Sequence, residues 1–210
     1  MYVLIYLPWF CYIENTITPG LPIIHIIHCS LDDLIPFNEY FIIPYMSWFL
    51  YIVFACLFVL YKGSDSEFKK LALSLVIGMS LCMTICMIYP SGLNLRPVEF
   101  PRHNIFSTLV SFIYSSDTPT NVFPSVHVYN SLAIHVSISK LKVLENYKWV
   151  KSCSLVVCIL ICLSTVFIKQ HSLIDVAGAI VLMIVLYVGI YVLDYNKLFA
   201  KAKRNKEILE

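Results

Sequence analysis

The chain has 210 residues, of which 59% are hydrophobic and only 13% are charged. With a mean hydropathy of +0.78, these values lie well outside the range of soluble domains and predict a single-domain integral membrane protein. The formal net charge of +2 comes with no nucleic-acid-binding motif, so we expect no nucleic-acid partner.

Apolar runs long enough for a helical membrane crossing, which needs roughly 20 residues, recur along the chain. The N-terminal run, 1–13, is short, so it is either a tilted or interfacial helix or the remainder of a longer one. It lacks the features of a cleaved signal peptide, and we expect it to be retained. Five longer runs follow, at 41–62, 69–89, 123–143, 152–169 and 174–194. Together they predict an all-α, polytopic membrane helix bundle with about six transmembrane helices.

We divide the chain into three parts: an apolar N-terminal segment with an outer loop (1–40), a membrane domain (41–195) and a basic cytoplasmic tail (196–210). Six crossings place nearly all basic residues on one face, which the positive-inside rule assigns to the cytoplasm. We therefore expect a plasma-membrane protein with a cytoplasmic C-terminus. The three cations on the outer face are Arg96, Arg102 and Lys169.

Two outer loops carry further polar residues. In the first, Asp32 and Asp33 lie near two histidines, but no spacing matches a closed metal site, so we expect no metal and no other cofactor. In the second, 89–123, Asn104 is placed to cap an interfacial helix over 105–114. This helix either covers an active site or is a surface connector without contact to substrate.

The first polar block, Phe123-Pro124-Ser125-Val126-His127, lies where an apolar run begins. Free N–H groups at a helix start favour an anion, and Ser125 can cap the helix or bind phosphate. His127 is suited to protonate a departing alkoxide. Just before this block, we expect Asp117 and Asn121 to shape the turn rather than to contact substrate. Trp48 and the other tryptophans fit interfacial aromatic belts.

The second polar block begins the last apolar run and contains Lys169, His171 and Asp175. His171 and Asp175 are four residues apart, so they share one helix face, where the carboxylate can orient the imidazole and leave its other nitrogen free to attack. Lys169 can neutralise charge on a transferring phosphoryl group. The alternative is a helix-start cluster in which Lys169 snorkels, His171 caps and Asp175 is solvated. Ionisable groups at membrane segments favour the functional interpretation.

The chain resembles the type 2 phosphatidic acid phosphatase superfamily over about residues 40–195. The resemblance rests on the order and spacing of Arg96-Pro97, Pro124-Ser125-Val126-His127 and the block from Ser164 through His171 to Asp175. It implies a six-helix bundle with its active site at the outer membrane–water interface, without a metal. The roles it implies are His171 as the nucleophile that forms a phosphohistidine, Asp175 as its partner, His127 as general acid, and Arg96, Ser125 and Lys169 as phosphate-binding residues.

Two positions depart from the family pattern, because Tyr89 and Thr165 stand where the family usually has a lysine and an arginine. Arg96 and Lys169, with Arg102 as a further candidate, must then supply the positive charge. A third block of the Lys-Gln-His type is similar to the inositol phosphorylceramide synthase-like (inositolphosphotransferase) branch, which transfers a phosphoryl-alcohol group to a lipid hydroxyl. Hydrolysis and transfer both stay open at this point.

The expected function is therefore that of an enzyme, a lipid phosphatase or lipid phosphotransferase. Its partners are a lipid phosphate substrate, membrane lipids, and water or an alcohol as acceptor. The alternative is a non-catalytic membrane transporter or anionic-lipid-binding protein that uses the same bundle.

Overall fold

The structure is a computed structural model that describes residues 2–193, so the predicted basic tail (196–210) and the end of the run 174–194 lie outside the described residues. The described chain is mostly helical, with two strands of two residues each. The helices and strands are α1 (Val3–Thr16), β1 (His25–Ile26), α2 (Ser30–Leu34), the 3-10 helix η1 (Glu39–Phe41), α3 (Ile42–Lys62), α4 (Asp65–Ile88), β2 (Ser91–Gly92), α5 (Ile105–Ser116), α6 (Val126–Lys140), the 3-10 helix η2 (Lys142–Leu144), α7 (Lys148–Phe167), α8 (Leu173–Tyr187) and the π-helix η3 (Val188–Val192).

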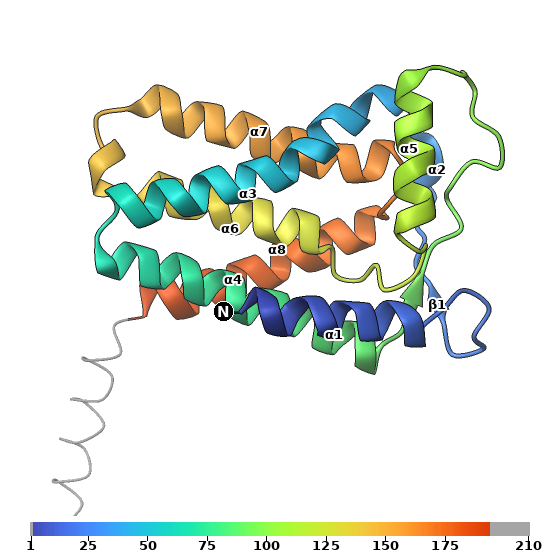
Figure 1. The fold of residues 1–210 in the computed structure, drawn as a ribbon, viewed down its shortest axis with the longest axis horizontal. Helices are drawn as coiled ribbons and strands as arrows, with labels where there is room; N and C mark the ends of the chain where they lie inside the picture. The colour runs from blue at the N-terminus through green and yellow to red at the C-terminus, as the bar shows by residue number, and fades with distance from the viewer. Residues whose placement is uncertain (1, 194–210) are drawn as a thin grey trace, which may run out of the picture.

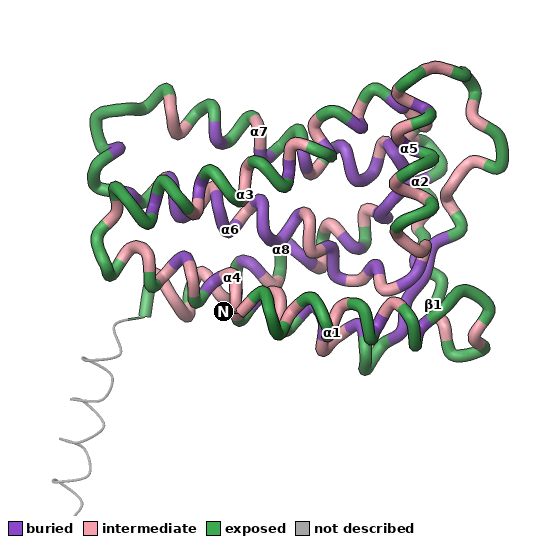
Figure 2. The backbone as a smooth tube through the Cα atoms, in the orientation of Figure 1, coloured by how far each residue is buried: buried purple, intermediate pink, exposed green. Residues whose placement is uncertain are grey.

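The long helices lie side by side along one axis, and α5 crosses their ends at one side of the molecule (Figure 1). Helix α6 is the centre of the bundle, since it packs against α3, α4, α7 and α8. Figure 2 shows buried positions concentrated on α6, whereas α1 is largely exposed. Because its neighbours cover it, α6 can bury polar side chains such as Asn130, Ser131 and Ser137.

Four helical segments are long and apolar enough to cross a membrane: 39–62, 65–88, 148–167 and 173–192. They confirm the helical class, and they coincide with four of the predicted apolar runs. The predicted run 123–143 is a shorter helix of 15 residues, because Ser125 caps its start and the chain leaves the helix at Leu141. The N-terminal helix α1 has 14 residues and packs on α4.

The helix predicted over 105–114 is confirmed as α5, and the side chain of Asn104 accepts hydrogen bonds from the Phe106 and Ser107 N–H groups. A short parallel pairing was not predicted: His25 pairs with Ser91, and Ile26 with Gly92. Two-residue strands have no alternating pattern that a sequence could reveal. The pairing ties the two long loops together at the α5 end of the bundle.

Close packing between α4 and α6 depends on Gly78, whose missing side chain leaves room for the ring of Tyr129. The Tyr129 hydroxyl donates to the carbonyl of Ser74, at 2.8 Å, one turn away on α4. Gly78 thus leaves the space and Tyr129 fills it, which lets α4 and α6 pack closely.

Replacing Gly78 by alanine should lower the free energy of unfolding by about 1–3 kcal/mol, because the new methyl group would overlap the Tyr129 ring. Thermal unfolding of the detergent-purified protein measures this. Leu73→Ala, at an exposed position of the same helix, is the control and should have little effect. An unchanged melting temperature for Gly78→Ala would contradict this packing.

Candidate active site

The two polar blocks, far apart in the sequence, meet at the α5 end of the bundle. The backbone N–H of Ser125, at the start of α6, lies 3.3 Å from the carbonyl oxygen of Asp175 in the first turn of α8. The rings of His127 and His171 lie close together, with their centroids 5.7 Å apart and their planes tilted by 60°. The fold therefore brings together the two histidines that the sequence singles out.

His171 and Asp175 form a buried pair. Nδ1 of His171 lies 3.3 Å from Oδ2 of Asp175, and the same oxygen accepts the Ser172 N–H at 2.9 Å. The carboxylate is completely buried, and 7% of His171 is exposed. When Asp175 is ionised it can only accept a hydrogen bond, so this pairing favours the tautomer in which Nδ1 carries the hydrogen and Nε2 carries the lone pair. This is the arrangement that a nucleophilic imidazole requires.

His127 lies against aromatic side chains of α3. Its ring centroid is 4.8 Å from that of Tyr45 and 4.4 Å from that of Trp48. Among residues 2–193, its Nδ1 is buried without a hydrogen-bond partner. The prediction that Trp48 belongs to an interfacial belt was wrong, because Trp48 is buried against His127. Aromatic residues are common at both places, so sequence alone did not separate them.

Both histidines line a cavity of about 350 Å³. Aromatic and aliphatic side chains of α1 and α3 form much of its wall, and the polar turn after α5 forms another part. The end of α5 contributes Ile113 and Ser116, which favours the first interpretation of this helix, that it covers the site. The other lining residues are Tyr6, Leu7, Phe10, Glu14, Tyr45, Trp48, Phe49, Met83, Asp117, Thr118, Thr120, Asn121, Val122, Val126 and Gln170.

Arg96 stands next to this cavity but does not line it. Its guanidinium donates to the side chain of Gln170 at 2.6 Å and to the carbonyl oxygens of Tyr114 and Asp117 at 3.2 and 2.9 Å. It also stacks on the Tyr114 ring, 4.4 Å from the centroid. Arg96 thus holds Gln170 and Asp117, which do line the cavity.

Lys169 is also bound to protein groups. Its ammonium donates to the carbonyl oxygens of Asp32 and Ile35, at 2.8 and 2.6 Å, and Lys169 does not line the cavity. Its backbone is left-handed, with φ of 56°, a conformation that lysine rarely adopts. Burial lowers the pKa of this ammonium. Lys169 fastens the turn between α7 and α8 to α2.

The other two predicted phosphate-binding candidates have structural partners as well. Ser125 is completely buried, and its hydroxyl accepts the Val128 N–H at 3.4 Å as the cap of α6. Arg102 forms two bonds to the Glu39 carboxylate, at 2.6 and 2.8 Å. Neither residue lines the cavity.

Sequence reasoning missed the role of Asp32. This buried carboxylate accepts the Ser172 hydroxyl at 2.6 Å, the Leu173 N–H at 2.9 Å and the Cys29 N–H at 2.9 Å. Burial alone would raise the pKa of Asp32, but these hydrogen bonds hold it below its ordinary value. Asp32 therefore caps α2 and α8 together. Nothing in the sequence distinguishes it from its neighbour Asp33, which is exposed.

The turn after α5 is tied to α1 through Glu14. The Glu14 carboxylate accepts the Thr118 hydroxyl at 2.5 Å and the Asn121 amide at 2.8 Å. Burial and the nearby Glu14 raise the pKa of Asp117 to about 6. Asn121 has a left-handed backbone, so it shapes the turn as predicted, but both it and Asp117 also line the cavity.

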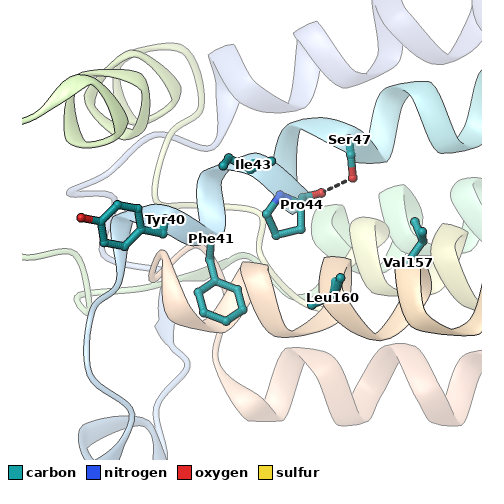
Figure 3. Close-up of a pocket in the computed structure, with 7 residues that line it drawn as sticks. All are labelled: Tyr40, Phe41, Ile43, Pro44, Ser47, Val157 and Leu160. Carbon is teal, nitrogen blue, oxygen red and sulfur yellow. Dashed lines mark hydrogen bonds between the residues drawn. The ribbon is translucent and has the colours of Figure 1, made fainter.

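A second cavity, of about 420 Å³, lies between α3 and α7 (Figure 3). Its lining is almost wholly apolar, and the Ser47 hydroxyl is used in a 2.7 Å bond to the carbonyl of Pro44. It offers no group for catalysis. Within residues 2–193, no three His, Cys, Asp or Glu side chains converge as a metal site would need.

Comparison of the chain with protein-family models, curated proteins and solved structures gives no match. Function must therefore be inferred from the chain's own residues and their geometry.

Replacing Asp32 by alanine should lower the free energy of unfolding by at least about 3 kcal/mol, because two backbone N–H groups and a hydroxyl lose a charged acceptor. Asp33→Ala is the matched control. The exposed Asp33–His28 pair should contribute no more than about 1 kcal/mol. Chemical or thermal unfolding in detergent compares the two, and equal losses would contradict the anchoring role of Asp32.

The raised pKa of Asp117 predicts a pH dependence of stability. The folded protein keeps this proton at a pH where the unfolded chain has lost it, so stability falls as pH rises from the ordinary value of 3.8 to about 6. Asp117→Asn should remove this part of the slope, whereas Asp33→Asn should not. Unfolding midpoints measured across this window test it, and parallel wild-type and Asp117→Asn curves would refute it.

Proposed function

We propose that the chain is a membrane-embedded lipid phosphatase or lipid phosphotransferase that works through a phosphohistidine. The observation that carries the proposal is the pair of histidines, one of them buried and oriented by a carboxylate, whose rings lie 5.7 Å apart in the wall of one cavity. Such an arrangement supplies a nucleophile and a general acid on either side of one reacting group.

In the first half of the reaction, Nε2 of His171 attacks phosphorus and forms a P–N bond while the P–O bond to the leaving alcohol breaks. His127 gives its proton to the departing oxygen. Asp175 stabilises the imidazolium that develops on His171. In the second half, the now neutral His127 takes a proton from water or an alcohol, whose oxygen attacks phosphorus as the P–N bond breaks and His171 is restored.

The same proposal includes the membrane arrangement. Helices α1 and α6 would complete six crossings, with the cavity at the outer interface and the C-terminus in the cytoplasm. Lysines gather at the end opposite the cavity, including Lys62, Lys70 and Lys140, and this supports the orientation in a plasma membrane. Aromatic side chains of α1 that line the cavity, such as Tyr6 and Phe10, suit contact with a lipid tail. The resemblance to the type 2 phosphatidic acid phosphatase superfamily belongs to this proposal.

The charges around the cavity bear on the choice between hydrolysis and transfer. Arg96 and Lys169 are bound to protein groups, while Glu14 and Asp117 line the wall. A phosphomonoester with two negative charges would need more free cations than a phosphodiester with one. This balance favours a phosphodiester lipid as donor, and so the transferase branch.

The alternative is a non-catalytic membrane transporter or anionic-lipid-binding protein on the same bundle. Its support is the departure from the family pattern, since Tyr89 and Thr165 stand where the family usually has two cations that hold the reacting phosphate group. It predicts binding without turnover.

Replacing His171 by glutamine should reduce turnover by about 10³-fold or more, and Asp175→Asn should cause a smaller but still large loss, while both proteins stay folded. The assay is release or transfer of phosphate-containing groups from a panel of lipid phosphomonoesters and phosphodiesters, with chelator present. His25→Gln, on an exposed histidine outside the cavity, is the control. Full activity of His171→Gln would refute the mechanism. If the wild-type protein bound lipid but showed no turnover, either in water or with any of a range of alcohol acceptors, the alternative would be supported.

A further inference from the structure

A polar cavity of about 360 Å³ lies where the α3–α4 link and the end of α6 meet. In Figure 1 these two segments are at the left, at the end of the bundle opposite α5. The start of α4, the end of α6, η2 and η3 form it together. Its lining residues are Ser64, Ser66, Glu67, Lys70, Ser137, Lys140, Lys142 and Tyr191. We call it the lysine cavity.

The lysine cavity has an excess of positive charge. Three lysines line it, and Glu67 is its carboxylate. The Glu67 oxygens accept the N–H and hydroxyl of Ser64 and the N–H of Lys142, so they cap helix α4. Within the part of the chain that the structure describes, none of the three lysines pairs with an acidic side chain.

Aromatic rings rather than acids lie near two of these ammonium groups. Nζ of Lys70 is 5.7 Å from the centre of the Tyr191 ring, and Nζ of Lys140 is 5.5 Å from that of Tyr187. Such contacts hold a lysine in place without neutralising it. The charge of the cavity therefore remains available to an anion.

The surroundings of the cavity suit a lipid. Helix α8 and its continuation η3, which carries Tyr191, expose the apolar residues Val185, Val188 and Val192. A phosphate head group in the cavity would leave its acyl chains beside this apolar surface. Basic pockets between membrane helices on the cytoplasmic side bind phosphate-containing lipid head groups in this manner.

We propose that the lysine cavity binds the phosphate head group of an anionic phospholipid. The site is separate from the two histidines and does not depend on their chemistry. It gives the chain a lipid-binding site at the end of the bundle where the proposed orientation places the cytoplasmic leaflet.

The experiment is native mass spectrometry of the detergent-purified full chain, titrated with phosphatidylglycerol or with phosphatidylcholine. Wild type should retain one tightly bound phosphatidylglycerol and hold phosphatidylcholine much more weakly. The triple variant Lys70→Gln, Lys140→Gln, Lys142→Gln should bind phosphatidylglycerol at least about tenfold more weakly. The single variant Lys70→Gln, which is the milder change, should show an intermediate loss.

The matched control is Lys62→Gln, Lys148→Gln, Lys151→Gln, which removes the same charge at the same end but outside the cavity. Equal weakening in this control would overturn the proposal, since it would show only diffuse attraction. Wild-type binding by the cavity variant would also overturn it. Displacement of the lipid by inorganic phosphate at the lipid's own concentration would assign the site to free phosphate instead. His171→Gln should bind as wild type does, so failure of the catalytic mechanism leaves this test intact.

Discussion

Helix α8 begins beside the buried polar side chains of Ser172 and Asp175, and the way in which its first N–H groups are satisfied determines the rest of the candidate site. A helix start leaves N–H groups without intrahelical partners, and burial makes each of them costly to leave unpaired. Asp32, from the distant helix α2, accepts the Leu173 N–H and the Ser172 hydroxyl, while Asp175 accepts the Ser172 N–H. The position of His171, one residue before the cap Ser172, follows from these bonds.

Asp175 has two structural tasks that reinforce each other. As the third residue of α8 it closes the capping box with Ser172, and with the same oxygen it faces Nδ1 of His171. A carboxylate fixed by a helix cap has little freedom to rotate, so the imidazole it orients is fixed as well. Lys169 completes the support by holding the preceding turn to α2. The cluster that the sequence suggested for phosphate binding is in large part the framework that positions His171.

Sequence reasoning found what depends on local spacing. The apolar runs predicted the long helices, and Asn104 predicted the start of α5. The interval of four residues predicted that His171 and Asp175 share one face. It could not find what depends on tertiary contact. Asp32 and Asp33 are identical neighbours, yet one is fully buried and the other exposed. The aromatic contacts of His127 likewise come from α3, and no spacing within one segment encodes them.

The distribution of charge around the cavity bears on the kind of head group that the proposed enzyme would accept. Arg96 donates hydrogen bonds to the Gln170 side chain and to two carbonyl oxygens. Its guanidinium therefore lies behind the cavity wall and positions residues that line the cavity. Glu14 is equally occupied, by Thr118 and Asn121, and its charge makes ionisation of Asp117 harder. Two carboxyl groups line the cavity, whereas the nearby cations Arg96 and Lys169 do not. This arrangement disfavours a ligand with two negative charges. For the enzyme proposed above, a head group that carries one negative charge, as a phosphodiester does, would meet less repulsion there than a phosphomonoester with two.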